Sequence, residues 1–294
     1  MLYDKDYVVT FDGLVFNVIG YDHPCGRVLA NLKYVGGRKW KWGYSQGREF
    51  LLRDYPAYVE EFISVPLEYV ERSYFARDGL TKVRAKRQRL PLESTAIELA
   101  DRLSDRLAVP LENFGVTDSL LWGGTDEQSD IDLIVVMNAS ENVLLDRLPN
   151  VFQHPMFERL GAENFSRDPS KRKSSDAVIR QRTYHKGIFD GCRFSLRAVR
   201  DQPSLGCLHG TETEWVSKGR NKLRSRITST AESLFFPIIY RLEDGCQMIS
   251  YFTEHEGILR VGDHVLIQAE LQHCGSDRLL ITQETDQIQL LEQL

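Results

Sequence analysis

The chain has 294 residues and a net charge of −5, and 42% of its residues are hydrophobic, 27% charged and 10% aromatic. This composition excludes the disordered and collagen-like classes, and the length favours two or three domains. No apolar run approaches the ~20 residues of a membrane span, and the N-terminus lacks the basic and apolar regions of a secretory signal. Five scattered cysteines without a CxxC pair argue against a disulfide framework and a cysteine zinc site. We therefore expect a cytoplasmic protein without membrane association.

Residues 1–85 are predicted to form a β-rich N-terminal domain. Short alternating runs separated by Gly-containing turns predict strands at 7–10, 14–21 and 27–35. A short helix is expected at Tyr55–Phe62. In RKWKWGY, Trp40 and Trp42 alternate with lysines, which fits either a base-stacking face or an edge strand with half-buried aromatic rings.

Residues 90–200 are predicted to form a mixed domain, after a basic linker that ends at Arg89. Apolar residues recur at helical spacing from Leu92 to Leu107, which predicts an amphipathic helix. Two strands are expected next, a short one at 114–117 and a buried one at 130–137, followed by a helix that Ser140 could cap. The run 186–199 predicts a hairpin that turns at Asp190-Gly191.

Residues 203–294 are predicted to form a third domain. From ESLFFPIIYRLE onward, β-like segments alternate with Gly-containing turns. A small barrel, with the OB type as one form of it, is the expected architecture.

Asp130 and Asp132 are the candidate catalytic pair, at the start of the predicted strand DIDLIVVM. Residues two apart in a strand project from the same face, so both carboxylates point the same way while Ile131 and Leu133 point into the core. Two neighbouring carboxylates repel each other unless a cation lies between them. Mg²⁺, with Mn²⁺ as a substitute, prefers carboxylate oxygen and commonly bridges a protein to phosphate. The pair therefore predicts a metal site.

Upstream of the pair, Asp118-Ser119 forms a turn between a short strand and a short helical stretch. Backbone N–H groups at such a turn, together with the Ser119 hydroxyl, favour the phosphates of a nucleotide.

This segment resembles the DNA polymerase beta-like nucleotidyltransferase superfamily. Members carry a Gly-Ser or Gly-Gly turn, often a glycine four residues on, and then Asp-x-Asp about ten residues later. Here Ser119 matches the second turn position, Gly123 the later glycine, and Ser129 with Asp130 and Asp132 the SDIDL end. The resemblance covers residues 92–199. It implies that Asp130 and Asp132 hold the metal and are catalytic, and that the turn, with Ser119, Gly123 and Ser129, binds a nucleoside triphosphate.

Two positions depart from the family pattern. Asp118 stands where the family has glycine, and it adds bulk and negative charge near the phosphates. It could cap the following helix or reach a metal, and capping is our expectation. Ser195 occupies the position, in GCRFSLRAV, where active members place a third carboxylate.

The hypothesis is an α/β (α+β) nucleotidyltransferase core flanked by small β-rich domains. It moves a nucleoside monophosphate from an NTP to an acceptor hydroxyl. Three basic runs, Lys82–Arg89, Arg167–Lys173 and Lys218–Arg226, make RNA or DNA the leading acceptor, although a protein or small molecule remains open. The alternative is a catalytically degenerate protein that keeps the fold as a nucleic-acid or nucleotide-binding module. The sequence indicates neither base preference nor oligomeric state.

Overall fold

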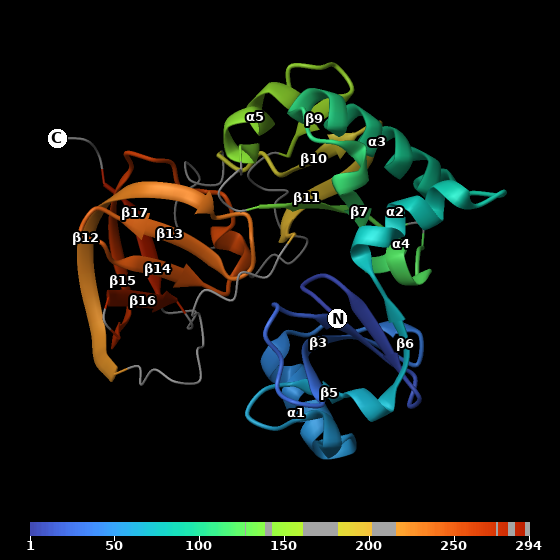
Figure 1. Ribbon diagram of the computed structural model, residues 1–294, viewed down its shortest axis with the longest axis horizontal. Coiled ribbons are helices and arrows are strands. Elements are labelled where there is room, and N and C mark those ends of the chain that lie inside the picture. Colours follow the sequence, from blue (N-terminus) through green and yellow to red (C-terminus); the bar gives the residue numbers. More distant parts are fainter. Residues whose placement is uncertain are drawn as a thin grey trace. The chain divides into compact units, whose positions relative to one another are not determined.

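The computed structural model describes residues 1–126, 128–138, 143–160, 182–201, 216–274, 276–281 and 286–291 (Figure 1). The chain forms two compact units, Met1–Val136 with Phe194–Leu205, and Met137–Arg193 with Gly206–Leu294. Three sheets and five α-helices in the described residues make it a mixed α+β protein, as the sequence predicts. None of the helices in these ranges combines the length and the apolar character needed to cross a membrane.

The N-terminal sheet has the order β4-β3-β2-β1-β6, and β5 pairs with β3. Its strands are β1 (Tyr7–Thr10), β2 (Leu14–Val18), β3 (Arg27–Val35), β4 (Arg38–Lys39), β5 (Ser64–Pro66) and β6 (Val70–Tyr74). Every second residue of β3 is buried, so the alternation that predicts this strand also selects its core face.

The helix of this region differs from the prediction. Helix α1 spans Tyr44–Asp54, and the range expected to be helical holds only a 3-10 turn at Pro56–Tyr58. Proline disfavours helical backbone in the residue before it, and Tyr55 accordingly has φ −143°. Strand β4 forms the edge of the sheet, and the Trp40 ring packs against Phe50 with centroids 4.9 Å apart. Trp40 is therefore partly buried against the core, whereas Trp42 is 63% exposed.

The first half of the predicted linker is helical. Helix α2 (Ala76–Ala85) takes in the first half of the basic run Lys82–Arg89, and helix α3 (Pro91–Leu107) follows. Helix α2 packs closely on strand β7 (Phe114–Val116), since a Cβ atom on Gly115 would lie 2.2 Å from the backbone oxygen of Ala76. Helix α3 buries an apolar stripe, which confirms its predicted amphipathic character: Ala96, Leu99, Ala100, Leu103 and Leu107.

The central sheet has the order β7-β8-β11-β10-β9. Its further strands are β8 (Ile131–Met137), β9 (Phe157–Arg159), β10 (Lys186–Phe189) and β11 (Cys192–Arg200). Helices α4 (Asp118–Trp122) and α5 (Leu144–Val151) complete this part of the chain. The predicted hairpin turn is confirmed, because Asp190 and Gly191 join β10 to β11 with φ of 46° and 75°. Ser140 and the basic run Arg167–Lys173 lie outside the described residues.

The C-terminal sheet has the order β12-β13-β14-β16-β15-β17, and an additional pairing of β12 with β15 closes a five-stranded ring (Figure 1). Its strands are β12 (Val216–Glu232), β13 (Ile238–Leu242), β14 (Gln247–Ser250), β15 (His264–Cys274), β16 (Ser276–Ile281) and β17 (Gln287–Leu290). All pairs are antiparallel except β14 with β16. The enclosed core includes Tyr240, Met248, Leu259 and Val265, each with 0% exposure.

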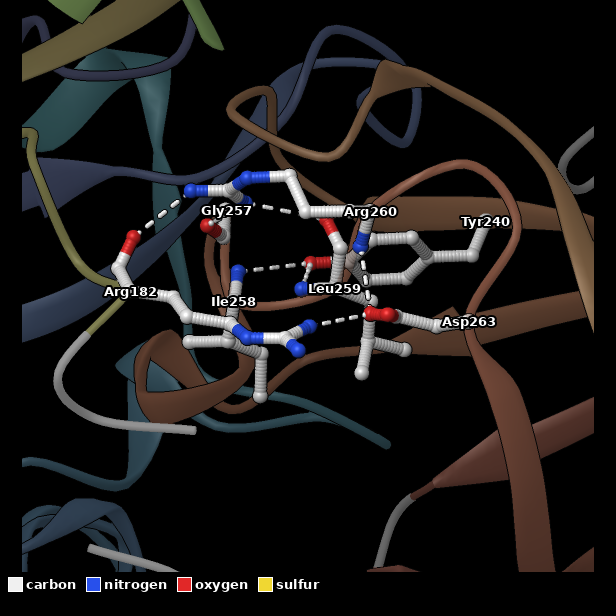
Figure 2. A network of polar contacts seen from close by, with 7 residues as sticks. All are labelled: Arg182, Tyr240, Gly257, Ile258, Leu259, Arg260 and Asp263. Carbon is white, nitrogen blue, oxygen red and sulfur yellow. Dashed lines mark hydrogen bonds and ion pairs between the residues drawn. The ribbon is translucent and has the colours of Figure 1, made fainter. Parts of the chain in front are cut away.

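Polar contacts hold the loop between β14 and β15 against the ring (Figure 2). The Tyr240 hydroxyl accepts a hydrogen bond from the Ile258 backbone N–H at 3.1 Å. The Arg260 guanidinium donates to the Gly257 carbonyl at 2.8 Å and to the Arg182 carbonyl at 2.7 Å. Buried polar groups are costly unless paired, so these bonds fix the course of the loop.

Candidate active site

Two strand ends bring the candidate residues together. Strand β7 pairs antiparallel with β8, with Val116 opposite Leu133, and the backbone N–H of Thr117 donates to the Asp132 carbonyl at 2.9 Å. The turn after β7 therefore lies beside the start of β8. Asp132 is partly exposed between the buried Ile131 and Leu133, as the alternation predicts, and Asp130 lies one residue before the strand.

Asp118 is held by the N-terminal sheet. The Tyr7 hydroxyl of β1 donates a hydrogen bond to the Asp118 carboxylate, and Nζ of Lys33 on β3 lies 3.7 Å from the same oxygen. Tyr7 is fully buried, so its hydroxyl is a fixed donor. The two side chains that contact Asp118 thus lie more than 80 positions before it in the sequence.

The expectation that Asp118 caps helix α4 is wrong. Thr117 is the N-cap residue, no side chain caps the helix, and Asp118 is the first helical residue. Its φ is +51°, a left-handed conformation that glycine adopts readily and that aspartate tolerates better than most residues. The backbone at Asp118 thus has a conformation that glycine adopts most readily, while the carboxylate contacts Tyr7 and Lys33.

The pKa values of Asp118 and Asp132 are shifted in opposite directions. Burial alone would raise the pKa of Asp118, but Lys33, the Tyr7 hydrogen bond and Arg197 together hold this pKa below its ordinary value. Burial and the neighbouring charge of Asp118 raise the pKa of Asp132 to about 6, against the lowering effect of a hydrogen bond from Ser195. Burial is therefore the largest cause of the raised pKa of Asp132, and the negative charge of Asp118 adds to it.

Strand β11 supplies two further groups from the neighbouring position in the sheet. Ser195 is buried and its hydroxyl donates to Asp132 Oδ1 at 2.5 Å, so this side chain faces Asp132. Arg197, two residues on, lowers the pKa of both Asp118 and Asp132. Strand spacing from Ser195 is a signal that could have identified Arg197, whereas nothing in the sequence points to Tyr7 or Lys33.

The remaining predicted nucleotide-binding residues shape the loop between α4 and β8. Gly123 ends α4 with φ +90°, and its N–H donates to the Ser119 carbonyl at 3.1 Å. The Ser129 hydroxyl donates to Asp126 Oδ1 at 2.9 Å and accepts from the Asp126 N–H at 2.8 Å. Ser119 is buried, with 7% exposure. Phosphate binding by these residues stays a prediction.

The carboxylates suit a metal shared with a substrate better than one enclosed by protein. Within the ranges that the structure describes, no three His, Cys, Asp or Glu side chains converge as ligands of one ion. Mg²⁺ usually keeps several waters and binds through one or two carboxylates plus substrate phosphates. Asp130 and Asp132 fit that pattern, because a cation beside Asp132 would offset the charge that raises its pKa.

Comparison with known proteins finds an archaeal relative to which no activity is assigned. The chain is 24% identical to an uncharacterized protein, MJ1086, of Methanocaldococcus jannaschii, in an alignment of 308 positions that covers 91% of this chain and 90% of the relative. No protein-family model matches the chain. No solved structure matches it significantly.

Proposed function

We propose that the chain is a Mg²⁺-dependent nucleotidyltransferase that moves a nucleoside monophosphate from an NTP to an acceptor hydroxyl. One observation carries the proposal: two carboxylates, Asp130 and Asp132, stand at the start of the buried strand β8. The charge of a third carboxylate, Asp118, acts on Asp132, and the cations Lys33 and Arg197 act on Asp118. Transfer from an NTP requires carboxylates that hold a metal ion and, next to them, cationic side chains that hold the phosphates.

In the proposed reaction, an acceptor hydroxyl oxygen bonds to the α-phosphorus of the NTP. The bond from that phosphorus to the bridging oxygen breaks, pyrophosphate leaves, and the hydroxyl proton passes to water. Mg²⁺, when bound, neutralises phosphate charge and favours ionisation of the attacking hydroxyl.

The chain's own groups position these partners. Asp130 and Asp132 would hold the ion, and the Ser195 hydroxyl fixes the orientation of the Asp132 carboxylate. Lys33 is paired with Asp118 at 3.7 Å, and its side chain is 36% exposed, so it can turn towards an incoming phosphate. Arg197 adds a second positive charge that persists at any physiological pH.

RNA or DNA is the acceptor class that the charge distribution favours. The run Lys218–Arg226 lies on an exposed strand, where basic side chains attract phosphate backbones.

The second candidate is a binding module without catalysis. Ser195 in place of an acid and the pairing of Asp118 with Lys33 favour it, because both reduce the charge available for a second metal ion. It differs from the first candidate in one measurable respect, which is turnover.

The test is incorporation of each of four α-labelled NTPs into RNA, DNA and the protein itself, with Mg²⁺ or with EDTA. We expect Mg²⁺-dependent transfer by the wild type and a loss of at least 100-fold in Asp130→Asn/Asp132→Asn, in line with metal-dependent transfer. The matched control is Asp105→Asn, an exposed aspartate on α3. No transfer to any acceptor by the wild type, or equal transfer by the double variant, would refute the proposal.

A further inference from the structure

Strand β12 carries a row of basic side chains on the outside of the C-terminal ring. Arg220, Lys222, Arg224 and Arg226 occupy alternate positions and are all exposed. They pair without interruption with β15, from Arg220 opposite Glu270 to Arg226 opposite His264. Because alternate residues of a strand share a face, the four side chains form one line.

The residues between the four cations show that the cations face outwards from the ring. Leu223 packs against the core of the ring, and Ile227 is part of it with 1% exposure. Lys218 is also exposed, just before a register shift at Gly219, whose φ is +75°. The strand is therefore anchored by its inner face and presents its cations to solvent.

The middle of the row is not neutralised by acids. Arg220 pairs with Asp286 at 2.6 Å and Arg226 with Glu243 at 2.8 Å, at the two ends. Lys218, Lys222 and Arg224 have no acidic partner within the described parts of the chain. Across the strand, Lys222 is opposite Gln268 and Arg224 is opposite Leu266.

The strand positions beside Lys222 and Arg224 carry no charge. Strand β17 pairs with the other edge of β15, with Gln287 opposite Gln268 and Gln289 opposite Leu266. Both glutamines of β17 are exposed. Amide side chains beside a cationic row can donate to phosphate and sugar oxygens, and they bring no charge that repels a polyanion.

We propose that this outer face of β12 binds the backbone of single-stranded nucleic acid. Cations two residues apart in a strand repeat every ~6.7 Å along one line. An extended polynucleotide strand presents its phosphates as a line with a comparable repeat, whereas a membrane presents charge across a plane. The face would serve the acceptor of the proposed transfer, yet the binding needs neither metal nor NTP.

The experiment measures fluorescence anisotropy of a labelled 15-nucleotide oligouridine with the full-length chain, in EDTA and without nucleotide, from 50 to 300 mM NaCl. The variant is Lys218→Gln/Lys222→Gln/Arg224→Gln. The control, Arg53→Gln/Arg72→Gln/Arg106→Gln, removes the same charge from exposed residues outside the three basic runs.

We expect the β12 variant to bind at least tenfold more weakly at 50 mM NaCl. The slope of log binding constant against log salt concentration should become shallower by about 2, because each of the three lost phosphate contacts contributes roughly 0.7 to it. The control binds as the wild type does. A charge-preserving variant, Lys222→Arg/Arg224→Lys, keeps its affinity, which separates loss of charge from loss of folding.

Three results would overturn the inference. These are unchanged binding by the β12 variant, an equal loss in the control, and wild-type binding to phosphatidylserine vesicles but not to the oligonucleotide. EDTA and the absence of NTP prevent transfer, so this assay measures binding alone. A negative binding result therefore does not test the proposed reaction, and a negative transfer result does not test this binding.

Discussion

Asp132→Asn should make the metal-free protein more stable. The pKa of Asp132 rises from 3.8 to about 6 because burial and Asp118 disfavour the ionised form. A rise of that size corresponds to about 3 kcal/mol of destabilisation at pH 7. Asparagine keeps the acceptor oxygen for Ser195 but still pays part of the burial cost, so we expect a net gain of about 1–2 kcal/mol.

The pH dependence has a definite sign. The folded protein binds the Asp132 proton more tightly than the unfolded chain does, so wild-type stability from this group is full below about pH 4 and falls as pH rises through about 6. The advantage of Asp132→Asn should therefore be near zero at pH 4 and complete at pH 7.

Urea unfolding in EDTA at several pH values measures this difference, with Asp105→Asn as the control. No gain in stability at pH 7, or a gain independent of pH, would refute the electrostatic account of Asp132. Adding Mg²⁺ at ten times its Kd should then stabilise the wild type by about 1.4 kcal/mol and leave Asp132→Asn unchanged.

Other variants test the packing and the site. Gly115→Ala should destabilise the protein by about 1–3 kcal/mol in urea unfolding, because the new methyl group meets the Ala76 backbone at 2.2 Å; a loss below about 0.5 kcal/mol would contradict that close contact. Tyr240→Phe removes a hydroxyl that bridges two backbone groups and should cost about 1–3 kcal/mol, and an unchanged unfolding midpoint would show that these bonds contribute nothing. Ser195→Ala removes the hydrogen bond that lowers the pKa of Asp132, so this pKa should rise. As the pH is lowered, the variant should therefore lose Mg²⁺-dependent activity at a higher pH than the wild type does. If activity falls at the same pH in the variant and in the wild type, Ser195 does not have this role.

Local patterns predicted much of the secondary structure, because their cause lies within a few residues. The apolar stripe of α3 and the Asp190-Gly191 turn both follow from spacing and from backbone preferences. Strand β12 was missed because its exposed half reads as a polar, basic run, and only pairing with β15 makes it a strand.

The site was predictable to the extent that it is contiguous in sequence. Asp132 lies where strand alternation predicts, Asp130 precedes the strand by one residue, and Ser195 reaches Asp132 from the next strand of the sheet. The partners of Asp118 come from the N-terminal sheet, and no local pattern encodes a contact between β1 or β3 and a turn over 80 residues later. That distant contact also explains why helix capping was the wrong expectation.

The central claim is that Asp130 and Asp132 hold a metal ion together with an NTP. A crystal structure with Mn²⁺ and an NTP analogue that cannot be cleaved between the α- and β-phosphates tests it most directly, since the anomalous signal locates the ion. We expect the ion between the two carboxylates and the triphosphate, with Lys33 turned from Asp118 towards the phosphates. An ion or nucleotide bound away from this pair, or no binding at millimolar concentrations, would contradict the claim.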